Sequence, residues 1–170
     1  MKALHTLKFT LTAAALGCLA LGLASTPAAA ATTATTTFAV TATVEGTCTV
    51  TATAMAFGNY VPTTASTSTS SVSVTCTNGT TYNVGLDAGK ATGATVGNRS
   101  MTGPGSVLLN YVLTQDSAHT INWGDTVGTD TVTGTGNGSA QSITVYGQVA
   151  ANQYVTANAY TDTITATVTY

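Results

Sequence analysis

The residues that could support catalysis in this 170-residue chain are few and isolated. His119 stands three residues after Asp116 in a polar stretch, and a Ser–His–Asp arrangement can be assembled from side chains distant in sequence. No Gly-x-Ser-x-Gly elbow accompanies this histidine, and such a motif carries weight only in its structural context. We therefore interpret His119 as an ordinary loop residue and expect no catalytic residues and no enzyme activity.

Sites for ions and cofactors are not indicated either. The acidic residues are scattered singly, without the Asp-x-Asp-x-Asp-Gly spacing of a calcium loop. Asp125 and Asp130 flank a Gly/Thr stretch and are interpreted as ordinary loop carboxylates. Gly134, Gly136 and Gly138 lack the Gly-x-Gly-x-x-Gly spacing and the following helix of a phosphate-binding loop. We expect no metal and no cofactor.

The first thirty residues are typical of a secretory signal peptide. Two early lysines precede an uncharged apolar run over 9–24, and alanines at 28–30 supply the small residues that a signal peptidase accepts. The run is shorter than the roughly 20 apolar residues that a membrane-spanning helix needs. The sequence therefore predicts a signal peptide over 1–30, with cleavage after Ala30 or Ala31, and export of the remaining chain.

Cys48 and Cys76, the two cysteines beyond the signal peptide, predict one disulfide bond. An exported chain with two cysteines most simply joins them. A metal site would need more ligands, and His119 is the one histidine outside the signal peptide. The third cysteine, Cys18, lies among apolar residues of the signal peptide, so we do not expect a lipid anchor.

The charge of the mature chain argues against two classes of partner. Two cations oppose six carboxylates, so the net charge is −4 with histidine neutral. A nucleic-acid binder needs a positive face to neutralise phosphates, and attraction to anionic lipid also needs cations. We expect no nucleic-acid binding and no membrane insertion. The charged residues are Lys90, Arg99, Glu45, Asp87, Asp116, Asp125, Asp130 and Asp162.

Alternation of apolar and polar residues predicts a protein made of β-strands. Over 160–170, threonine takes every second position and most residues of the other parity are apolar, as in a strand with one buried face. The same alternation predicts strands over 38–44 and from Thr47 onward. Further strands are predicted over 72–76, 82–86, 107–113 and 143–149.

Turn residues separate these predicted strands. Asn78-Gly79 predicts a hairpin between the strands on either side of it. Residues 63–71 are interpreted as a surface loop that enters a strand, and 134–138 as a turn. A short strand or kink is predicted over 57–60, and an irregular loop over 88–105 with a short strand near Met101.

The pattern as a whole predicts an all-β fold. No segment beyond the signal peptide has apolar residues at helical spacing, and short strands between turn residues favour an antiparallel sandwich. Apolar residues make up 44% of the chain. About 140 mature residues are enough for one domain with its own core and hardly enough for two.

Several short motifs follow one another along the mature chain. They are Cys48, Phe57-Gly58-Asn59-Tyr60, Ser73-Val74-Thr75-Cys76-Thr77, Arg99-Ser100-Met101, Leu109-Asn110-Tyr111, Asn122-Trp123-Gly124, Val145-Tyr146-Gly147-Gln148 and the closing segment 160–170. Single motifs are weak, but the ordered set resembles the spore coat protein U domain, which is similar to the subunits of archaic chaperone–usher pili. The resemblance covers essentially the whole mature chain.

This resemblance implies an incomplete immunoglobulin-like antiparallel β-sandwich that lacks its final strand. In such pili a periplasmic chaperone lends the missing strand, and at an outer-membrane usher the N-terminal strand of the next subunit replaces it. The implied organisation is a signal peptide over 1–30, an N-terminal extension with the donor strand over 31–46, and the β-sandwich domain over 47–170. The implied donor residues are Phe38, Val40, Ala42 and Val44, and the implied acceptor edge is Ile164, Ala166, Val168 and Tyr170.

The function implied is that of a structural pilus subunit, which polymerises by donor-strand exchange and serves surface attachment and biofilm formation. Its expected partners are the chaperone, the usher and identical or related subunits, and its expected location is a cell-surface pilus reached through the periplasm. The alternatives are a monomeric secreted carbohydrate-binding protein, a spore-coat layer protein and, more weakly, a hydrolase built on His119. For Phe38–Val44, the alternative is an ordinary first strand of its own sandwich.

Overall fold

The computed structural model describes residues 28–170, so most of the predicted signal peptide lies outside the described residues. The chain divides into two units between Thr41 and Ala42, and each unit is described by itself. In the first unit, residues 28–41 contain no helix and no strand, and the side chains of Phe38 and Val40 are each 83% exposed.

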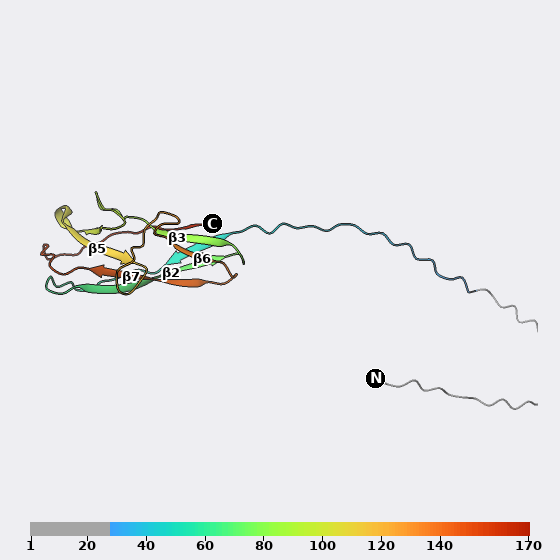
Figure 1. Cartoon of the computed structure of the whole chain (residues 1–170), viewed down its shortest axis with the longest axis horizontal. Coiled ribbons are helices and arrows are strands. Elements are labelled where there is room, and N and C mark those ends of the chain that lie inside the picture. Colours follow the sequence, from blue (N-terminus) through green and yellow to red (C-terminus); the bar gives the residue numbers. More distant parts are fainter. Residues whose placement is uncertain (1–27) are drawn as a thin grey trace, which may run out of the picture. The chain divides into compact units, whose positions relative to one another are not determined.

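The second unit is built from two antiparallel sheets (Figure 1). One sheet has five strands in the order β1-β2-β7-β5-β4, and the other has three in the order β6-β3-β8. Among the described residues the helical structure is limited to the 3-10 turn η1, Pro104–Ser106. The strands are β1 (Cys48–Ala52), β2 (Ser66–Cys76), β3 (Thr81–Leu86), β4 (Arg99–Thr102), β5 (Leu108–Thr114), β6 (Val132–Thr135), β7 (Gln141–Val149) and β8 (Ala166–Thr169).

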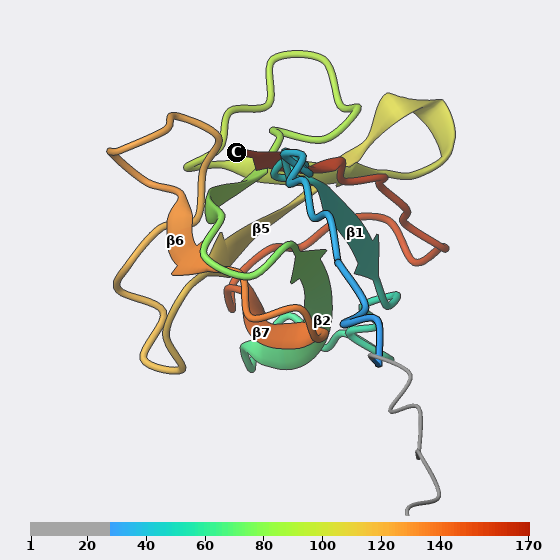
Figure 2. The same ribbon diagram turned by 90° about the vertical axis from the view of Figure 1, so that its right-hand side faces the viewer.

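The core lies between the two sheets. Viewed from the end, β2 and β7 lie on one side of the domain and the C-terminal strand lies on the other (Figure 2). Alternate residues of the facing strands are buried, as the strand period of two requires. Trp123 is fully buried among them, and its indole nitrogen donates to the carbonyl of Val84 at 2.8 Å. The predicted fold class, an all-β immunoglobulin-like sandwich, is confirmed.

The disulfide expected between the two mature cysteines is present. Cys48 opposes Cys76 in the ladder between β1 and β2, and the bond closes a sequence separation of 28 residues. The disulfide therefore fixes the first strand of the five-stranded sheet to its neighbour.

The predicted hairpin at Asn78-Gly79 is wrong. A turn is present, with Gly79 at φ 83°, but it carries the chain from one sheet to the other. Strand β2 already has β1 and β7 on its two edges, so no edge remains for β3, which pairs with β6 and β8. The Gly79 N–H donates to the carbonyl of Gly136 instead of closing a two-stranded ladder.

Three other expectations about strand limits need correction. Strand β2 begins at Ser66, so most of the predicted loop over 63–71 is a strand. Gly134 and Thr135 belong to β6 rather than to a turn. Of the two alternatives for 57–60, a short strand or a kink, the structure has no strand and a bend at Asn59. Strand β8 covers four residues of the segment 160–170, although the expected alternation of burial runs on from Tyr160 to Val168.

Candidate functional site

A groove of about 1060 Å³ runs along the domain between the two sheets. Its floor is apolar and includes Leu109 and Leu113 of β5 together with Val145 and Val149 of β7. One wall is the segment 52–60, which follows β1, and the other is the segment 155–166, which leads into β8. The groove therefore lies between the continuation of the first strand and the approach to the last.

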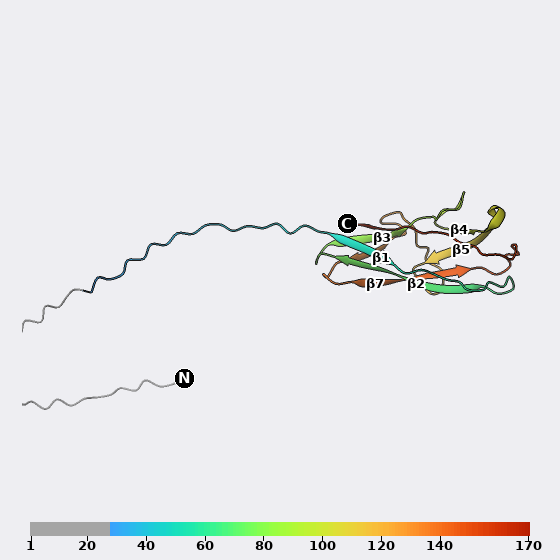
Figure 3. The same cartoon turned by 180° about the vertical axis from the view of Figure 1, so that it is seen from behind.

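This position coincides with two sheet edges that lack a neighbouring strand. Strand β1 is the outer strand of the five-stranded sheet, and β8 is the outer strand of the three-stranded sheet. The two strands lie beside each other at one end of the domain, where β1 passes close to the C-terminus (Figure 3). An immunoglobulin-like sandwich with one strand missing would be open at this place.

The backbone of the last segment offers free hydrogen-bonding groups toward the groove. Asp87 N donates to the carbonyl of Thr165 at 3.1 Å, so the backbone groups of Thr165 point to β3. Backbone groups of successive strand residues point to opposite edges. The N–H and C=O of Ile164 and Ala166 therefore point to the edge of β8 that no described strand pairs, while their side chains line the groove.

Serine side chains hold the first wall. The last backbone bond to β2 is that from Thr53 N to the carbonyl of Ser71 at 2.9 Å. Beyond it hydroxyl bonds take over: Ser66 Oγ donates to the carbonyl of Phe57 at 2.9 Å and Ser68 Oγ to that of Ala56 at 2.8 Å. Ser70 Oγ likewise donates to the carbonyl of Thr53. These serines lie on the half-buried face of β2, so the wall is attached to the sheet through side chains rather than through a backbone ladder.

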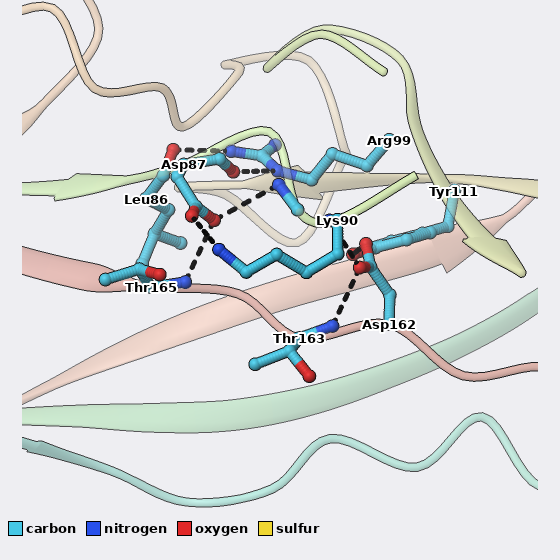
Figure 4. A network of polar contacts seen from close by, with 9 residues as sticks. Leu86, Asp87, Lys90, Arg99, Tyr111, Asp162, Thr163 and Thr165 are labelled. Carbon is cyan, nitrogen blue, oxygen red and sulfur yellow. Dashed lines mark hydrogen bonds and ion pairs between the residues drawn. The ribbon is translucent and has the colours of Figure 1, made fainter. Parts of the chain in front are cut away.

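Two carboxylates hold the second wall (Figure 4). Asp162 Oδ1 accepts the backbone N–H groups of Lys90 at 2.8 Å and Thr163 at 2.7 Å. Asp87 Oδ1 accepts the N–H groups of Gly89 at 3.1 Å and Thr165 at 2.9 Å. Residues 162–165 are thus kept extended although they belong to no strand.

One hydrogen bond crosses from this wall to the groove floor. Tyr111 Oη donates to Asp162 Oδ2 at 2.8 Å, and both residues line the groove (Figure 4). Burial, together with the bond to the Asp162 carboxylate, raises the pKa of the Tyr111 hydroxyl above its usual value. Tyr111 therefore stays protonated and remains the donor of this bond.

Arg99 stabilises the segments next to the second wall. Its side chain is fully buried and donates to four backbone carbonyls, those of Leu86, Asp87, Val96 and Trp123, at 2.6 to 2.8 Å. Burial lowers the pKa of the guanidinium, and nearby acidic groups oppose this shift. A guanidinium presents five donors in a fixed plane, which suits a set of converging carbonyls.

The sequence-predicted acceptor residues do not all lie in the groove. Ile164 and Ala166 line it, whereas Val168 packs against the core within β8. Tyr170 follows β8, is 59% exposed and is not among the lining residues. The predicted donor residues Ala42 and Val44 are exposed, as are Phe38 and Val40.

Several groove residues were not assigned to a binding site by the sequence, although some of them belong to the motifs named above. Met55, Phe57 and Tyr60 line the first wall, and Val155 and Tyr160 line the second. The alternation over 160–170 already placed Tyr160 on the face of Ile164, so this residue could have been found. Met55 and Val155 lie in segments without a regular apolar pattern, which gave no signal.

The polar loop at His119 shows no catalytic arrangement. The Asp116 carboxylate accepts the backbone N–H groups of Thr120 and Ile121 at 2.8 to 3.2 Å, and the Ile121 bond is the main reason that the pKa of Asp116 is lowered. His119 Nδ1 lies 3.1 Å from Thr114 Oγ1. Both side chains therefore stabilise the loop.

Residues 28–170 contain neither a metal-binding cluster nor a membrane-spanning helix. No group of three or more His, Cys, Asp or Glu residues in this part of the chain is placed to hold a metal ion. No helix in the same range is long and apolar enough to cross a membrane.

Comparisons with known proteins agree with this architecture. The family model of the Spore Coat Protein U domain matches residues 34–167. A solved chain matches with a TM-score of 0.58 and 22% identity; it comes from the CsuC–CsuE chaperone–tip adhesion subunit pre-assembly complex of archaic chaperone–usher Csu pili of Acinetobacter baumannii. The match covers 75% of this chain but 41% of that chain, and at this identity it shows a shared fold. No curated protein matches the sequence significantly.

Proposed function

Because the chain belongs to the spore coat protein U domain family, we propose that it is a structural subunit of a chaperone–usher pilus. In this proposal the subunits polymerise when the N-terminal segment of one molecule fills the groove of the next. Membership in a coat-protein family accords with the expectation that the chain is structural rather than enzymatic.

The observation that carries the proposal is the apolar groove beside two unpaired sheet edges. Strand addition to such an edge is a recognised mode of binding, in which backbone bonds give affinity and alternate side chains give register. The segment Phe38–Val44, called the donor segment below, has apolar side chains at every second position and no strand partner in the described chain. Its even-numbered residues supply the apolar face that the groove lacks.

The energetics favour insertion. Burial of a large apolar side chain contributes roughly 1.5–3 kcal/mol, and each backbone hydrogen bond adds about 1 kcal/mol net. Phe38, Val40 and Val44 are at present more than four-fifths exposed, so most of this free energy is still to be gained. Donation to a neighbour is a head-to-tail contact, which propagates into an open filament instead of closing.

The partners and the location follow from the same proposal. A periplasmic chaperone would fill the groove before assembly, an outer-membrane usher would exchange the chaperone strand for a donor segment, and the filament would lie outside the cell. Surface attachment and biofilm formation are the proposed roles of that filament. The signal peptide expected over 1–30 and the boundaries at 31 and 47 belong to this proposal.

The test uses the full mature chain with Ala42→Asp, which places a charge on the inserting face and prevents self-assembly. A synthetic peptide of residues 36–46 is titrated into this variant, and binding and thermal stability are measured. We expect saturable binding and a higher Tm. The same peptide with aspartate at position 42 is the control and should not bind.

Two results would contradict the proposal. One is a wild-type chain that stays monomeric and keeps its stability when residues 38–44 are deleted. The other is an Ala42→Asp chain that is already fully stable and shows no response to the peptide.

A further inference from the structure

We propose that a second pocket, on the outer face of the five-stranded sheet, binds a neutral saccharide of the size of a mono- or disaccharide. The pocket has a volume of about 340 Å³, near the lower end of the range for small-molecule sites. It is called the amide pocket below because the side chains of Asn98, Asn110, Gln148 and Gln153 belong to residues that line it. The inference goes beyond the proposed structural role and does not depend on it.

The amide pocket forms where β5 and β7 separate. The ladder between these strands ends where Val112 opposes Gln148. Beyond this pair, the Gln153 side chain bridges the two strands: its Oε1 accepts the Asn110 N–H at 2.8 Å, and its Nε2 donates to the carbonyls of Asn110 at 2.9 Å and Ala150 at 3.2 Å. A side-chain carboxamide thus takes the place that a peptide group would have in a continued ladder.

The segment that carries Gln153 is itself held in place. Gln153 N donates to the Tyr60 hydroxyl at 3.1 Å, and that hydroxyl donates to the carbonyl of Ala150 at 2.8 Å. Asn152 N donates to the carbonyl of Pro62 at 2.6 Å. The pocket is therefore pre-formed, and a ligand would not have to order its walls on binding.

Hydrogen-bonding groups of the amide pocket remain without a partner in the described part of the chain. The Asn110 amide is oriented by Ser100, whose Oγ donates to Asn110 Oδ1 at 2.8 Å, and this leaves Nδ2 available. Gln148 is half-buried on the outer face of β7, with its carboxamide unpaired among residues 28–170. Asn98 is bound to Thr95 through backbone groups of its own, so its carboxamide is also available.

These groups fit hydroxyls rather than ions. A carboxamide presents an acceptor and donors side by side, and a sugar hydroxyl both donates and accepts. Among the described residues, no charged side chain lines the pocket, so a phosphate, a carboxylate or an amine would lose hydration without meeting an opposite charge. Val112 and Ala150 also line the pocket and supply apolar surface for the C–H groups of a sugar ring.

An extended peptide is a poorer fit at this place. Strand addition needs free backbone groups on a sheet edge. The N–H and C=O of Asn110 are both taken by the Gln153 carboxamide, and β4 pairs with the other edge of β5. Recognition is therefore left to side chains, which favours a ligand rich in hydroxyl groups.

The pocket and the groove lie on opposite faces of the sheet. Asn110 of β5 and Gln148 of β7 alternate with Leu109 and Val149, which line the groove. A strand in the groove would therefore leave the amide pocket open. If the chain polymerises, every subunit would present one such pocket, and weak single contacts would add up to strong attachment.

Saturation-transfer NMR on the full mature chain tests the inference, because it detects a weakly bound ligand on monomers and polymers alike. The probes are glucose, galactose, mannose, N-acetylglucosamine, maltose and lactose, with glucuronic and galacturonic acid as the charged comparison. We expect at least one neutral probe to bind with a Kd of about 1 to 10 mM, the range for a ligand of this size. The uronic acids should bind more weakly.

Two pocket variants and one matched control locate the binding. Gln148→Leu keeps the bulk of the side chain but removes its hydrogen bonds, and Asn98→Ala removes a second amide. Each should weaken binding roughly three- to tenfold. Thr144→Ala is the control, because this residue is exposed on the same face of β7 outside the pocket, and it should leave binding unchanged. An unchanged Tm shows that each variant is folded.

Three results would overturn the inference. They are no binding of any neutral probe up to about 50 mM, stronger binding of the uronic acids, and binding that both pocket variants leave unchanged or that the control weakens equally. None of these results would affect the proposed function, which is tested by peptide capture in the groove.

Discussion

The buried side chain of Arg99 connects several segments that are separate in sequence. Its guanidinium joins carbonyls at the end of β3, in the loop before β4 and at Trp123. We expect Arg99→Lys to lower the free energy of unfolding by roughly 2–4 kcal/mol, because lysine has fewer donors and leaves buried carbonyls unpaired. Urea unfolding of the peptide-filled Ala42→Asp chain measures this effect. A loss below about 1 kcal/mol would show that water replaces the missing bonds.

Because of Asp87, the free energy of unfolding should depend on pH in the acidic range. Burial tends to raise its pKa, but hydrogen bonds from Thr165, Gly89 and Lys90 lower it below the ordinary value of 3.8. A carboxyl with a lowered folded pKa contributes stability above its unfolded pKa, and that contribution is lost as the pH falls through the folded value. We expect stability to fall below about pH 4 and Asp87→Asn to flatten this fall. Unfolding followed between about pH 2 and pH 7 checks it, and an unchanged profile in the variant contradicts it.

At the residue scale, the sequence predicted what depends on neighbours along the chain. The inward valines of β2 and the pairing of two exported cysteines needed only alternation and counting. Arg99, Asp87 and Asp162 could not be assigned, because their partners are backbone groups up to 78 residues away, as for Thr165 and Asp87. A charged residue in the sequence does not reveal that its role is to bind carbonyls or N–H groups.

Among the elements, the donor segment offers a matched pair of substitutions. Ala42 has the parity of the apolar donor side chains, whereas Thr43 has the opposite parity. We expect Ala42→Asp to abolish polymerisation, because an inserted carboxylate would be buried in an apolar groove without a partner. Thr43→Asp should polymerise normally, since its side chain faces water. Size-exclusion chromatography and electron microscopy separate the two outcomes, and equal behaviour would argue against strand insertion.

The first groove wall can be tested through the serines of β2. We expect Ser66→Ala, Ser68→Ala and Ser70→Ala together to slow peptide capture and to lower stability by about 1 kcal/mol for each lost bond. Thr67→Ala with Thr69→Ala is the control, because these side chains are exposed on the other face of β2. Stopped-flow fluorescence of a labelled peptide gives the capture rate. Equal rates for both sets would mean that the hydroxyl bonds do not position the wall.

The elements also show where local patterns stop being informative. The Ser/Thr stretch 63–71 looked like a loop because its inward residues are serines rather than valines, yet the serines face a wall that needs hydrogen-bond donors. Asn78-Gly79 correctly marked a turn, but the pairing of β3 was decided by the occupied edges of β2. Residues 162–165 alternate like a strand and are not one, because β3 ends at Leu86 and the carboxylates of Asp87 and Asp162 accept N–H groups where a ladder would continue.

For the whole molecule, the disulfide is the simplest global test. In the chain-entropy model, closing the 28-residue separation between Cys48 and Cys76 stabilises the fold by roughly 3–4 kcal/mol. We expect reduction, or Cys48→Ser with Cys76→Ser, to lower the urea midpoint of the peptide-filled chain by a corresponding amount. A variant that unfolds at the wild-type midpoint would show that the β1–β2 ladder alone holds the first strand.

The overall architecture was predictable because composition, alternation and the ordered motifs pointed to the same fold, and the family match confirms the resemblance. The acceptor edge stays a prediction: Ile164 and Ala166 line the groove, Val168 and Tyr170 do not, and the wall over 52–60 was not foreseen. A groove is formed by segments from both ends of the chain. The depth of the groove depends on how the two sheets pack, which no local sequence pattern contains.

The burial of Arg99 has a practical consequence. Trypsin cleaves after lysine and arginine, and residues 28–170 contain only Lys90 and Arg99. Lys90 is exposed, whereas Arg99 is inaccessible in the folded domain. A tryptic digest of the native protein should therefore stop at one nick per molecule, and amine-reactive dyes should find one lysine there. On the proposed cell-surface filament, tryptic shaving and lysine biotinylation would therefore each have one target, Lys90, within residues 28–170 of a subunit.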